Sequence, residues 1–579
     1  MKKGMFSRVT TVLTATAMTG GVCAIGLPPL NDDEKIVLSA ANSTYDALSD
    51  VSCKQVVFGA DNITLDLSAE GGKTITIPSD ITFDGFSFAA RYLSVCVKGG
   101  VWDFGGNANL RVGNGSTFHD EAIEFRGTKV RNVKDVKVGD GKRNCVLTLS
   151  NGAELDAESL RIATGSTGDH CRFEILSGSK AIITGNFIPE EGVVSGSGGN
   201  RLKVDGEGST LSVLNSSVLF GRGRSRSNDQ MSISDKGNVS MLNLTIGGSY
   251  TKDGTTDYAT NTVLTVDDAT LVVDGVLIIG DNGGSFNCAN VHDASISFDN
   301  LVIGSGILAS NNYFKISGTS SHLQRTAAVE NDPYFEKGGF NEFIVTDGAI
   351  VTNEFASSTY IGYQSSNNTV RISNRGMVYQ KGEQANYLGY NYTDGRGSSN
   401  TFAVEAGGTN NVHRFIICGC DNRLVVSNGT FLTRRTGAGS LWVGNNVDGS
   451  KNPNNNGIVL QGSSPRLQIS GGLMLANNSY LRFELDKDGY VSGNAPVSVK
   501  NLTIDSSSFV EVIPDAYLAN LGYVRAQLKL ITASNTLENL DSAIDAANAV
   551  LPERCRLVVE GSDLVLKISS GKGTVVSIR

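Results

Sequence analysis

The sequence contains few residues whose types and spacing could support acid–base chemistry. Cleavage of a sugar chain needs two carboxyl groups, or an Asp-bound calcium ion beside an Arg or Lys base. Asp267 and Asp268 are adjacent carboxylates, but they fall in a polar turn of the repeat described below, where Asp is an ordinary turn former. Arg371-Ile-Ser373 lacks a Lys, and Trp102-Asp103-Phe104 lacks a His. These segments predict no catalytic site.

The histidines and the motifs of nucleophilic enzymes do not predict a catalytic site either. The five histidines are scattered along the chain: His119, His170, His292, His322 and His413. His119-Asp120 is the best neighbouring pair, and we interpret it as a surface turn. No Gly-x-Ser-x-Gly elbow is present, and Gly72-Lys73-Thr74 has Leu67 where a phosphate-binding loop needs its first glycine. We expect no catalytic residue and no bound cofactor.

Calcium is the one metal that the sequence leaves open. Loops that begin at Asp281, Tyr392 and Asn445 are rich in Asp, Asn and Gly, and side-chain oxygens are the ligands that Ca²⁺ prefers. The same residues are ordinary turn formers, and no nine-residue calcium-roll motif recurs. We interpret these loops as solvated turns and keep calcium as the alternative.

Composition favours strands and turns over a compact mixed fold. Of 579 residues, 68 are Gly and only 10 are Pro, while 40% are hydrophobic and 18% are charged. A net charge of −9 argues against nucleic-acid binding, which needs concentrated Lys and Arg. Arg222, Arg224 and Arg226 form a local basic cluster that we interpret as a solvated loop.

The N-terminus is typical of an exported chain. Lys2, Lys3 and Arg8 precede a weakly apolar stretch from Val9 to Ala24 that contains no acidic residue, so we expect residues 1–24 to be a signal peptide. No later segment supplies about 18 uninterrupted apolar residues, which predicts no transmembrane span in the mature chain. Eight of the nine cysteines then remain, and export permits disulfides.

A repeat of about 22 to about 32 residues organises most of the chain. Its first half reads Asn, any residue, apolar, any residue, apolar, and then a polar turn that usually contains Gly. The copies begin at Asn200, Asn312, Asn341, Asn368, Asn400 and Asn422. Weaker copies near Met231, Val263 and Val291 divide the interval between the first two into four units.

The second half of the repeat reads apolar, any residue, apolar, Gly, and then a variable polar loop. Examples end at Gly247, Gly280, Gly304 and Gly444. Alternation with a period of two points every second side chain inward. A unit of this size cannot bury its apolar face alone, but stacked units close a continuous core. The pattern predicts an all-β fold, a parallel β-helix.

Stacking places equivalent residues about 4.8 Å apart along the axis. We therefore expect the repeated Asn to form a hydrogen-bonded ladder at one turn, and the Gly after the second strand to allow a tight corner without a Cβ clash. Cys145 and Cys171 replace this Asn in two consecutive coils, where they are predicted to form an inter-coil disulfide. Two small buried thiols are the alternative.

The regular pattern suggests four regions. Residues 1–24 are the expected signal peptide, 25–61 a lead-in, 62–500 the β-helix and 501–579 a C-terminal cap. In the cap, the sequence predicts a short helix near 537–547 and a β-hairpin over 556–568. A helix and a hairpin would cover a sheet edge that could otherwise recruit other chains.

From Asn144 to about Asn501, the repeats resemble the right-handed parallel β-helix passengers of bacterial surface proteins, including autotransporter-like repeat proteins and pectin-lyase-like solenoids. Members of such families act as adhesins, surface fibres or scaffolds, and some are polysaccharide lyases or hydrolases. The resemblance departs in one respect: no terminal segment matches a membrane β-barrel, so self-transport is not expected.

We therefore expect a secreted or cell-surface solenoid that presents loops to an extracellular glycan or protein partner without catalysis. One alternative is a carbohydrate-active enzyme, which requires Asp, Glu, His, Arg and Lys from neighbouring coils to converge in one groove. The other is a self-assembling component of a surface layer, which an uncapped end of the stack would favour.

Overall fold

The computed structural model describes most of the chain from residue 24 to residue 570. The gaps are 32–33, 78–92, 114–119, 141, 165–168, 186, 189–197, 223–227, 253–254, 326–331, 334, 354–357, 391–396, 446–452, 491–493 and 523. The expected signal peptide lies outside the described residues except for Ala24, and so do His119, Arg224 and Arg226. No helix in the described part is long and apolar enough to cross a membrane.

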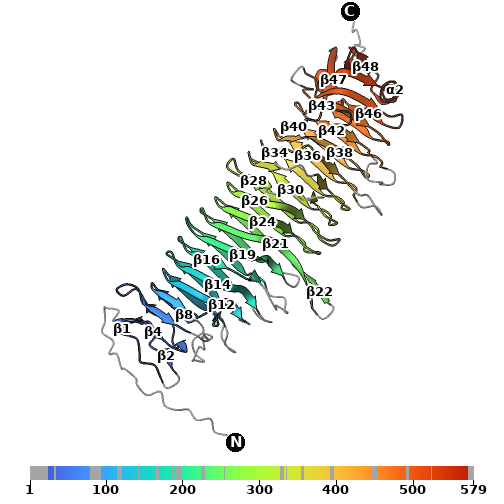
Figure 1. Ribbon diagram of the computed structural model, residues 1–579. Helices are drawn as coiled ribbons and strands as arrows, with labels where there is room; N and C mark the ends of the chain where they lie inside the picture. Colours follow the sequence, from blue (N-terminus) through green and yellow to red (C-terminus); the bar gives the residue numbers. More distant parts are fainter. Residues whose placement is uncertain are drawn as a thin grey trace, which may run out of the picture.

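The fold is an all-β solenoid, a parallel β-helix that rises coil by coil from one end of the molecule to the other (Figure 1). Almost every strand pairs in parallel with the equivalent strands of the coils before and after it. Two large sheets run the length of the stack, and short β2 (Lys35–Leu38) pairs only with β5 (Gln55–Phe58) near the N-terminal end.

The first large sheet has 19 strands, one from each coil, and forms one side of the solenoid. It contains β1 (Ala24–Gly26), β3 (Thr44–Asp46), β6 (Ile63–Asp66), β8 (Leu93–Lys98), β11 (Glu121–Arg126), β13 (Val146–Ser150), β15 (Arg172–Leu176), β18 (Arg201–Asp205), β20 (Gln230–Ser234), β23 (Val263–Asp267), β25 (Cys288–His292), β27 (Tyr313–Ser317), β30 (Glu342–Val345), β33 (Thr369–Ile372), β36 (Thr401–Glu405), β39 (Arg423–Ser427), β42 (Gly457–Gln461), β44 (Tyr480–Glu484) and β46 (Phe509–Ile513).

The second large sheet has 28 strands and supplies the rest of each coil. It contains β4 (Val51–Ser52), β7 (Thr74–Thr76), β9 (Val101–Asp103), β10 (Asn109–Val112), β12 (Lys129–Asp140), β14 (Glu154–Thr164), β16 (Lys180–Ile183), β17 (Phe187–Ile188), β19 (Thr210–Arg222), β21 (Asn238–Lys252), β22 (Thr255–Tyr258), β24 (Thr270–Ile279), β26 (Ser295–Ile303), β28 (His322–Arg325), β29 (Asp332–Pro333), β31 (Ile350–Asn353), β32 (Thr359–Ile361), β34 (Met377–Gln380), β35 (Ala385–Leu388), β37 (Thr409–Val412), β38 (Arg414–Ile417), β40 (Thr430–Thr433), β41 (Leu441–Val443), β43 (Arg466–Leu475), β45 (Val497–Ile504), β47 (Ala526–Glu538), β48 (Cys555–Glu560) and β49 (Asp563–Ile568).

Most coils cross the 28-stranded sheet in two segments. In β19 and β21 both segments belong to one long strand, and the pairing register shifts between Val213 and Ser217. In other coils the two segments are separate strands, as in β31 and β32. An extra residue in one strand bends it. The chain therefore changes direction between the two segments and can close around a core.

A continuous core fills the centre of the stack from Ile36 to Ile568. Its side chains come from alternate positions of each strand, as the period of two predicts. Leu147, Phe173 and Leu202 stack in register in β13, β15 and β18, and all three are fully buried. Each coil thus covers the apolar face that its neighbour exposes.

The repeated Asn residues form a ladder of hydrogen bonds at one buried corner. The main-chain N–H of Asn312 donates to Oδ1 of Asn341, and the same bond joins Asn341 to Asn368 and Asn368 to Asn400, each at 3.0 Å. The side-chain Nδ2 of each Asn also donates to the Oδ1 of the next, at 2.9–3.2 Å. Asn422 accepts both bonds from Asn400. One buried side chain therefore satisfies two donors of the preceding coil.

The ladder extends beyond the copies with Asn. Asn200 accepts from the main-chain N–H of Cys171 at 3.0 Å and donates its own N–H to the carboxylate of Asp229 at 2.7 Å. Thr262, Asn287 and Asn456 occupy the same buried position in other coils. Residues other than Asn therefore also occupy the ladder position.

The glycine that closes the second half of the repeat lies against the ladder. Gly280 and Gly304 have φ of +77°, a left-handed conformation, and a Cβ on either would fall 2.3–2.4 Å from the side chain of Asn312 or Asn341. Only glycine fits because both the backbone conformation and the space exclude a side chain. The predicted clash-free corner is confirmed.

The ends of the stack differ from the boundaries expected at residues 62 and 500. β1 pairs in parallel with β3, and β3 pairs with β6, so stacking is already established at residue 24. At the other end β47 still pairs in parallel with β45. The short first coils lack the Asn motif, so the repeat in the sequence does not extend to them.

The C-terminal end carries the expected helix and hairpin. α1 (Asp515–Leu521) follows β46, and α2 (Asp541–Val550) packs against β46 and β48. β48 and β49 form an antiparallel hairpin that also pairs with β47. The chain folds its last antiparallel strands over the end of the stack at the red end of Figure 1.

Replacing a ladder residue should destabilise the fold strongly. Asn368→Ala removes the acceptor of two buried donors of Asn341, and an unpaired buried donor costs about 1–3 kcal/mol. We expect the free energy of unfolding, measured by urea denaturation, to fall by about 2–4 kcal/mol. Asn215→Ala is the control, because the exposed Asn215 donates a single bond to the Thr184 carbonyl. Equal denaturation midpoints for both variants would contradict the ladder.

Cys145 and Cys171 stack at the ladder position, at the start of strands that pair in register. Both are buried free thiols: Cys145 Sγ donates to the Arg143 carbonyl at 3.4 Å, and Cys171 Sγ to the Lys142 carbonyl at 3.3 Å. The hydrogen bond with Cys171 and burial raise the pKa of the Cys145 thiol. In-register neighbours lie about 4.8 Å apart, whereas the Cβ atoms of a disulfide lie about 3.5–4.5 Å apart. The disulfide stays a prediction.

Peptide mapping without reduction tests the disulfide. A chain purified under oxidising conditions should yield two peptides joined through Cys145 and Cys171, because no other thiol pair is stacked by an in-register pairing of the described strands. Cys171→Ser is the matched control and should leave Cys145 available to alkylation after unfolding. Full alkylation of both thiols in the unreduced wild-type chain, once unfolded, would overturn the disulfide.

Candidate functional site

The two sequence motifs that resemble catalytic ones, at Asp267–Asp268 and at Trp102, lie at a turn and in the apolar core. Asp268 sits in a turn with φ of +45°, a conformation that Asp tolerates. Trp102 is fully buried, and its ring lies 5.9–6.3 Å from those of Phe58, Phe104 and Phe125. This segment is therefore part of the apolar core.

The described histidines lie on separate coils and do not converge. The exposed His170 contacts the buried carboxylate of Asp169, and His292, at the end of β25, contacts the carboxylate of Asp293. His322 shares a 3.3 Å hydrogen bond with the Thr352 hydroxyl. The described residues contain no group of three His, Cys, Asp or Glu that could hold a metal ion. Of the loops considered for calcium, Asp281 is described, whereas Tyr392–Gly395 and Asn446–Asp448 lie outside the described residues.

One charged cluster places a carboxylate beside two cations. On the outer side of β12 and β14, the carboxylate of Asp135 lies 3.5 Å from Lys137 Nζ and 3.5 Å from Arg161 Nε, and it accepts a hydrogen bond from the Ser159 hydroxyl at 2.5 Å. These four residues supply a single carboxylate that is already engaged. Glycosidic cleavage by paired carboxyl groups needs a second one.

The strongest candidate for a binding site is a row of large side chains on the outer side of the 28-stranded sheet. In-register pairing of β32, β35, β38, β41 and β43 places five residues along the axis of the stack. They are Tyr360, Tyr387, Ile416, Trp442 and Met474, and we call them the aromatic row. Their neighbours in each strand, such as Leu388 and Val443, point into the core.

Four tyrosines gather at the N-terminal end of the aromatic row. Tyr360 stacks on Tyr387 with ring centroids 5.1 Å apart and an interplanar angle of 9°. Tyr363 stacks on Tyr390, one coil further along, at 6.0 Å and 19°. The two pairs contact each other, since Tyr360 and Tyr390 lie 4.5 Å apart. Tyr360 is only 7% exposed, and this burial, reinforced by the neighbouring tyrosines, raises the pKa of its phenol to about 12.

The centre of the row is a small apolar cluster outside the main core. Ile416 is fully buried although it points outward, because it packs with Ala385 and Cys418 and against Tyr387 and Trp442. Tyr387, Trp442 and Met474 are half-buried. A sheet face in water usually carries polar residues. This stretch departs from that rule over several consecutive coils and is therefore a candidate interaction surface.

Arg414 borders the aromatic row and adds a positive charge. It precedes Ile416 by two residues, on the same outer side of β38, and its Nε donates to the Gly439 carbonyl at 2.9 Å. A Cβ on Gly439 would lie 3.2 Å from the ring of Trp442, 3.5 Å from Met474 Sδ and 3.6 Å from an Arg414 nitrogen. The guanidinium is therefore held beside the indole ring.

Further positive charge lies at the adjacent corner between the two segments of the sheet. Arg434 stacks over the Tyr379 ring at 5.3 Å and donates to the main-chain carbonyls of Gln380 and Lys381. Burial and the nearby Arg435 lower the pKa of Arg414. Among the described residues, neither Arg414 nor Arg434 forms an ion pair with a carboxylate. The corner is therefore positive on a chain whose net charge is −9.

The aromatic row was missed in the sequence, although a signal for it exists. Tyr360-Ile-Gly-Tyr363 and Tyr387-Leu-Gly-Tyr390 are copies of one motif in consecutive repeats, and Trp442 occupies the same outward position in Leu441-Trp-Val443. The repeat pattern treats that position as any residue. The row becomes visible when the outward residues at the same position of successive coils are compared with one another.

Comparisons with known proteins assign no family to this chain. A scan against protein-family models, a search of curated proteins and a search of solved structures gave no match. The functional proposal rests on the residues of the aromatic row and on the fold that places them.

Proposed function

We propose that the chain is an exported, cell-surface β-solenoid that binds an extracellular glycan along the aromatic row without cleaving it. The observation that carries the proposal is the row itself, in which half-buried Tyr387, Trp442 and Met474 lie along the axis with the buried Ile416 between Tyr387 and Trp442. An array of this shape suits an extended chain more than a compact ligand.

Several features of the row support a sugar as the partner. Aromatic side chains combine a flat apolar face with a polar edge, so they suit ligands that are themselves amphipathic. The half-buried Arg414 guanidinium supplies hydrogen-bond donors next to those faces. Trp, Tyr and Arg are the residues that contribute most to binding at interfaces.

The absence of catalysis is the other half of the proposal. The carboxylates considered for acid–base chemistry, Asp135 and the Asp267–Asp268 pair, lie on strands and turns of other coils, away from the aromatic row. Asp135 is also engaged by Lys137, Ser159 and Arg161. The row supplies binding groups without a carboxyl pair among its own five residues.

Trp442→Ala should weaken glycan binding by about tenfold to a hundredfold, because loss of a central aromatic anchor costs about 2 kcal/mol or more. A glycan array of neutral and acidic polysaccharides identifies the ligand of the wild-type chain, and titration calorimetry measures the affinity of the variant. A depolymerisation assay on the same glycans should yield no product.

Tyr313→Ala is the matched control, because Tyr313 points outward from β27 on the 19-stranded sheet, away from the aromatic row. Its affinity should equal that of the wild-type chain, and the melting temperatures of both variants should show that they are folded. Equal losses in the two variants would contradict a site at the row. Product formation by the wild-type chain would replace the proposal with a carbohydrate-active enzyme.

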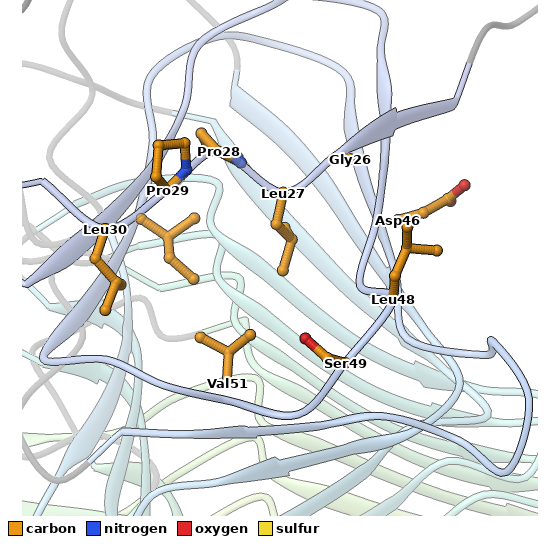
Figure 2. Close-up of a pocket in the computed structure, with 10 residues that line it drawn as sticks. Gly26, Leu27, Pro28, Pro29, Leu30, Asp46, Leu48, Ser49 and Val51 are labelled. Atoms are coloured by element: carbon orange, nitrogen blue, oxygen red, sulfur yellow. The ribbon is translucent and has the colours of Figure 1, made fainter.

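The N-terminal end of the stack favours a second candidate function, self-association. β1 pairs with β3, and no other described strand pairs with its outer edge. Beside that edge, Leu27, Pro28, Pro29 and Leu30 face Leu48 across a pocket of about 320 Å³ (Figure 2). Leu48 is 74% exposed. An open strand edge beside exposed leucines is a template for another chain.

The two ends of the stack predict the form of this association. α2 packs against β46 at the C-terminal end, whereas the described residues place no helix over β1. Contacts between two different ends can propagate into filaments, but a contact between two identical ends closes after one pair. We therefore expect a dimer joined through the N-terminal ends.

Leu48→Asp should weaken this dimer by about tenfold or more, because it places a charge in an apolar contact. Sedimentation velocity over a concentration series measures the dimer constant. Leu214→Asp is the control, since Leu214 is 55% exposed in β19, far along the chain from the open end. A wild-type chain that stays monomeric at every concentration would contradict the dimer, and filaments would contradict the closed pair.

A further inference from the structure

A group of polar side chains lies inside the solenoid, where most coils have apolar residues. Asn410 points inward from β37, between Val378 of the preceding coil and Phe431 of the following one. Asn386 points inward from β35, between Thr359 and Phe415. In most other coils the inward strand positions are filled by apolar side chains that stack on one another. The two inward amides therefore call for a partner that compensates for their burial.

The amides of Asn410 and Asn386 are only partly satisfied by the protein. Asn410 is fully buried, and neither its Oδ1 nor its Nδ2 has a protein hydrogen-bond partner. Asn386 is 8% exposed, and its Oδ1 also has none. Unpaired buried amide groups are rare in folded proteins because each one costs stability.

Both amides line the same small cavity. Asn353, Thr359 and Gln380 complete its polar wall, and Phe343, Ile361, Val370, Val378 and Phe402 form the rest. The volume open to the centre of a water molecule is about 20 Å³. One water needs at least about 10–15 Å³ by this measure and two to four polar partners. Both conditions are met.

The chemistry of the wall selects among small ligands. The polar groups are amides and one hydroxyl, with no carboxylate among the residues that line the cavity. Divalent cations prefer carboxylate oxygens, and an organic ligand needs a far larger volume. A water molecule can both donate and accept, which matches an amide that has both Oδ1 and Nδ2 unpaired.

We infer that this cavity is a binding site for one ordered water molecule, which hydrogen-bonds to Asn410 and Asn386 and bridges their two coils. The site lies directly behind the aromatic row. Asn386 and Tyr387 are neighbours on opposite faces of β35, and Thr359 and Tyr360 are neighbours on β32. The water therefore fixes, from inside, the strands that carry the tyrosines outside.

A high-resolution crystal structure of the full chain tests the site. We expect a density peak in the cavity at about 2.7–3.2 Å from Asn410 and from Asn386. Asn410→Leu has nearly the same side-chain volume and no amide, so it should lose the peak. Asn215→Leu, an exposed site, should keep it.

Each outcome decides the inference. No peak in a wild-type map that shows other buried waters would overturn it, and so would a peak whose contacts to oxygen are as short as those of a metal ion. If Asn410→Leu does not fold, the wild-type map still decides. Loss of the peak in Asn410→Leu and its retention in Asn215→Leu would establish the site.

Discussion

From Cys171 to Asn456 the stacking depends on one kind of hydrogen bond, from the buried main-chain N–H at a coil corner to a side-chain oxygen of the next coil. A buried N–H must be paired, and at this corner no strand ladder reaches it. Asn341, Asn368 and Asn400 pair it across successive coils at 3.0 Å. Because the side-chain oxygen of each ladder residue accepts from the ladder residue of the preceding coil, the bond also fixes the register between the two coils.

The rest of each coil follows from that register. Inward residues stack on inward residues and form one core, and the glycine that packs against the ladder closes the corner. The variable loops between corner and strand do not affect the register. They can differ in length from coil to coil, which explains why successive ladder residues are unevenly spaced in the sequence although the stack is regular.

The sequence predicted those parts of the fold in which the same residue type recurs at the same position of successive coils. The repeated Asn, the Gly that packs against it and the alternating apolar residues predicted the parallel β-helix, and the residues beyond the repeat predicted the C-terminal helix and hairpin. Asp229, whose carboxylate accepts the Asn200 N–H, and Thr262, whose N–H donates to Asn287, lie in the ladder without being Asn, so the repeated Asn does not reveal them. The first coils were missed because β1 and β3 are only three residues long.

The candidate site could not be predicted in the same way, because it exists only between coils. Tyr360 and Tyr387 belong to consecutive coils and touch only when the register is known. The inward amides of Asn386 and Asn410 look like ordinary turn residues in the sequence. Both features become visible once each strand position is assigned to the inner or the outer side.

An experimental density map of the corner would test the register most directly. It should show the Oδ1 atoms of Asn341, Asn368 and Asn400 one above another, each within hydrogen-bond distance of the main-chain nitrogen of the preceding ladder residue. A map in which these three side chains lie in separate lobes, or in which one coil is shifted by a residue, would contradict the account.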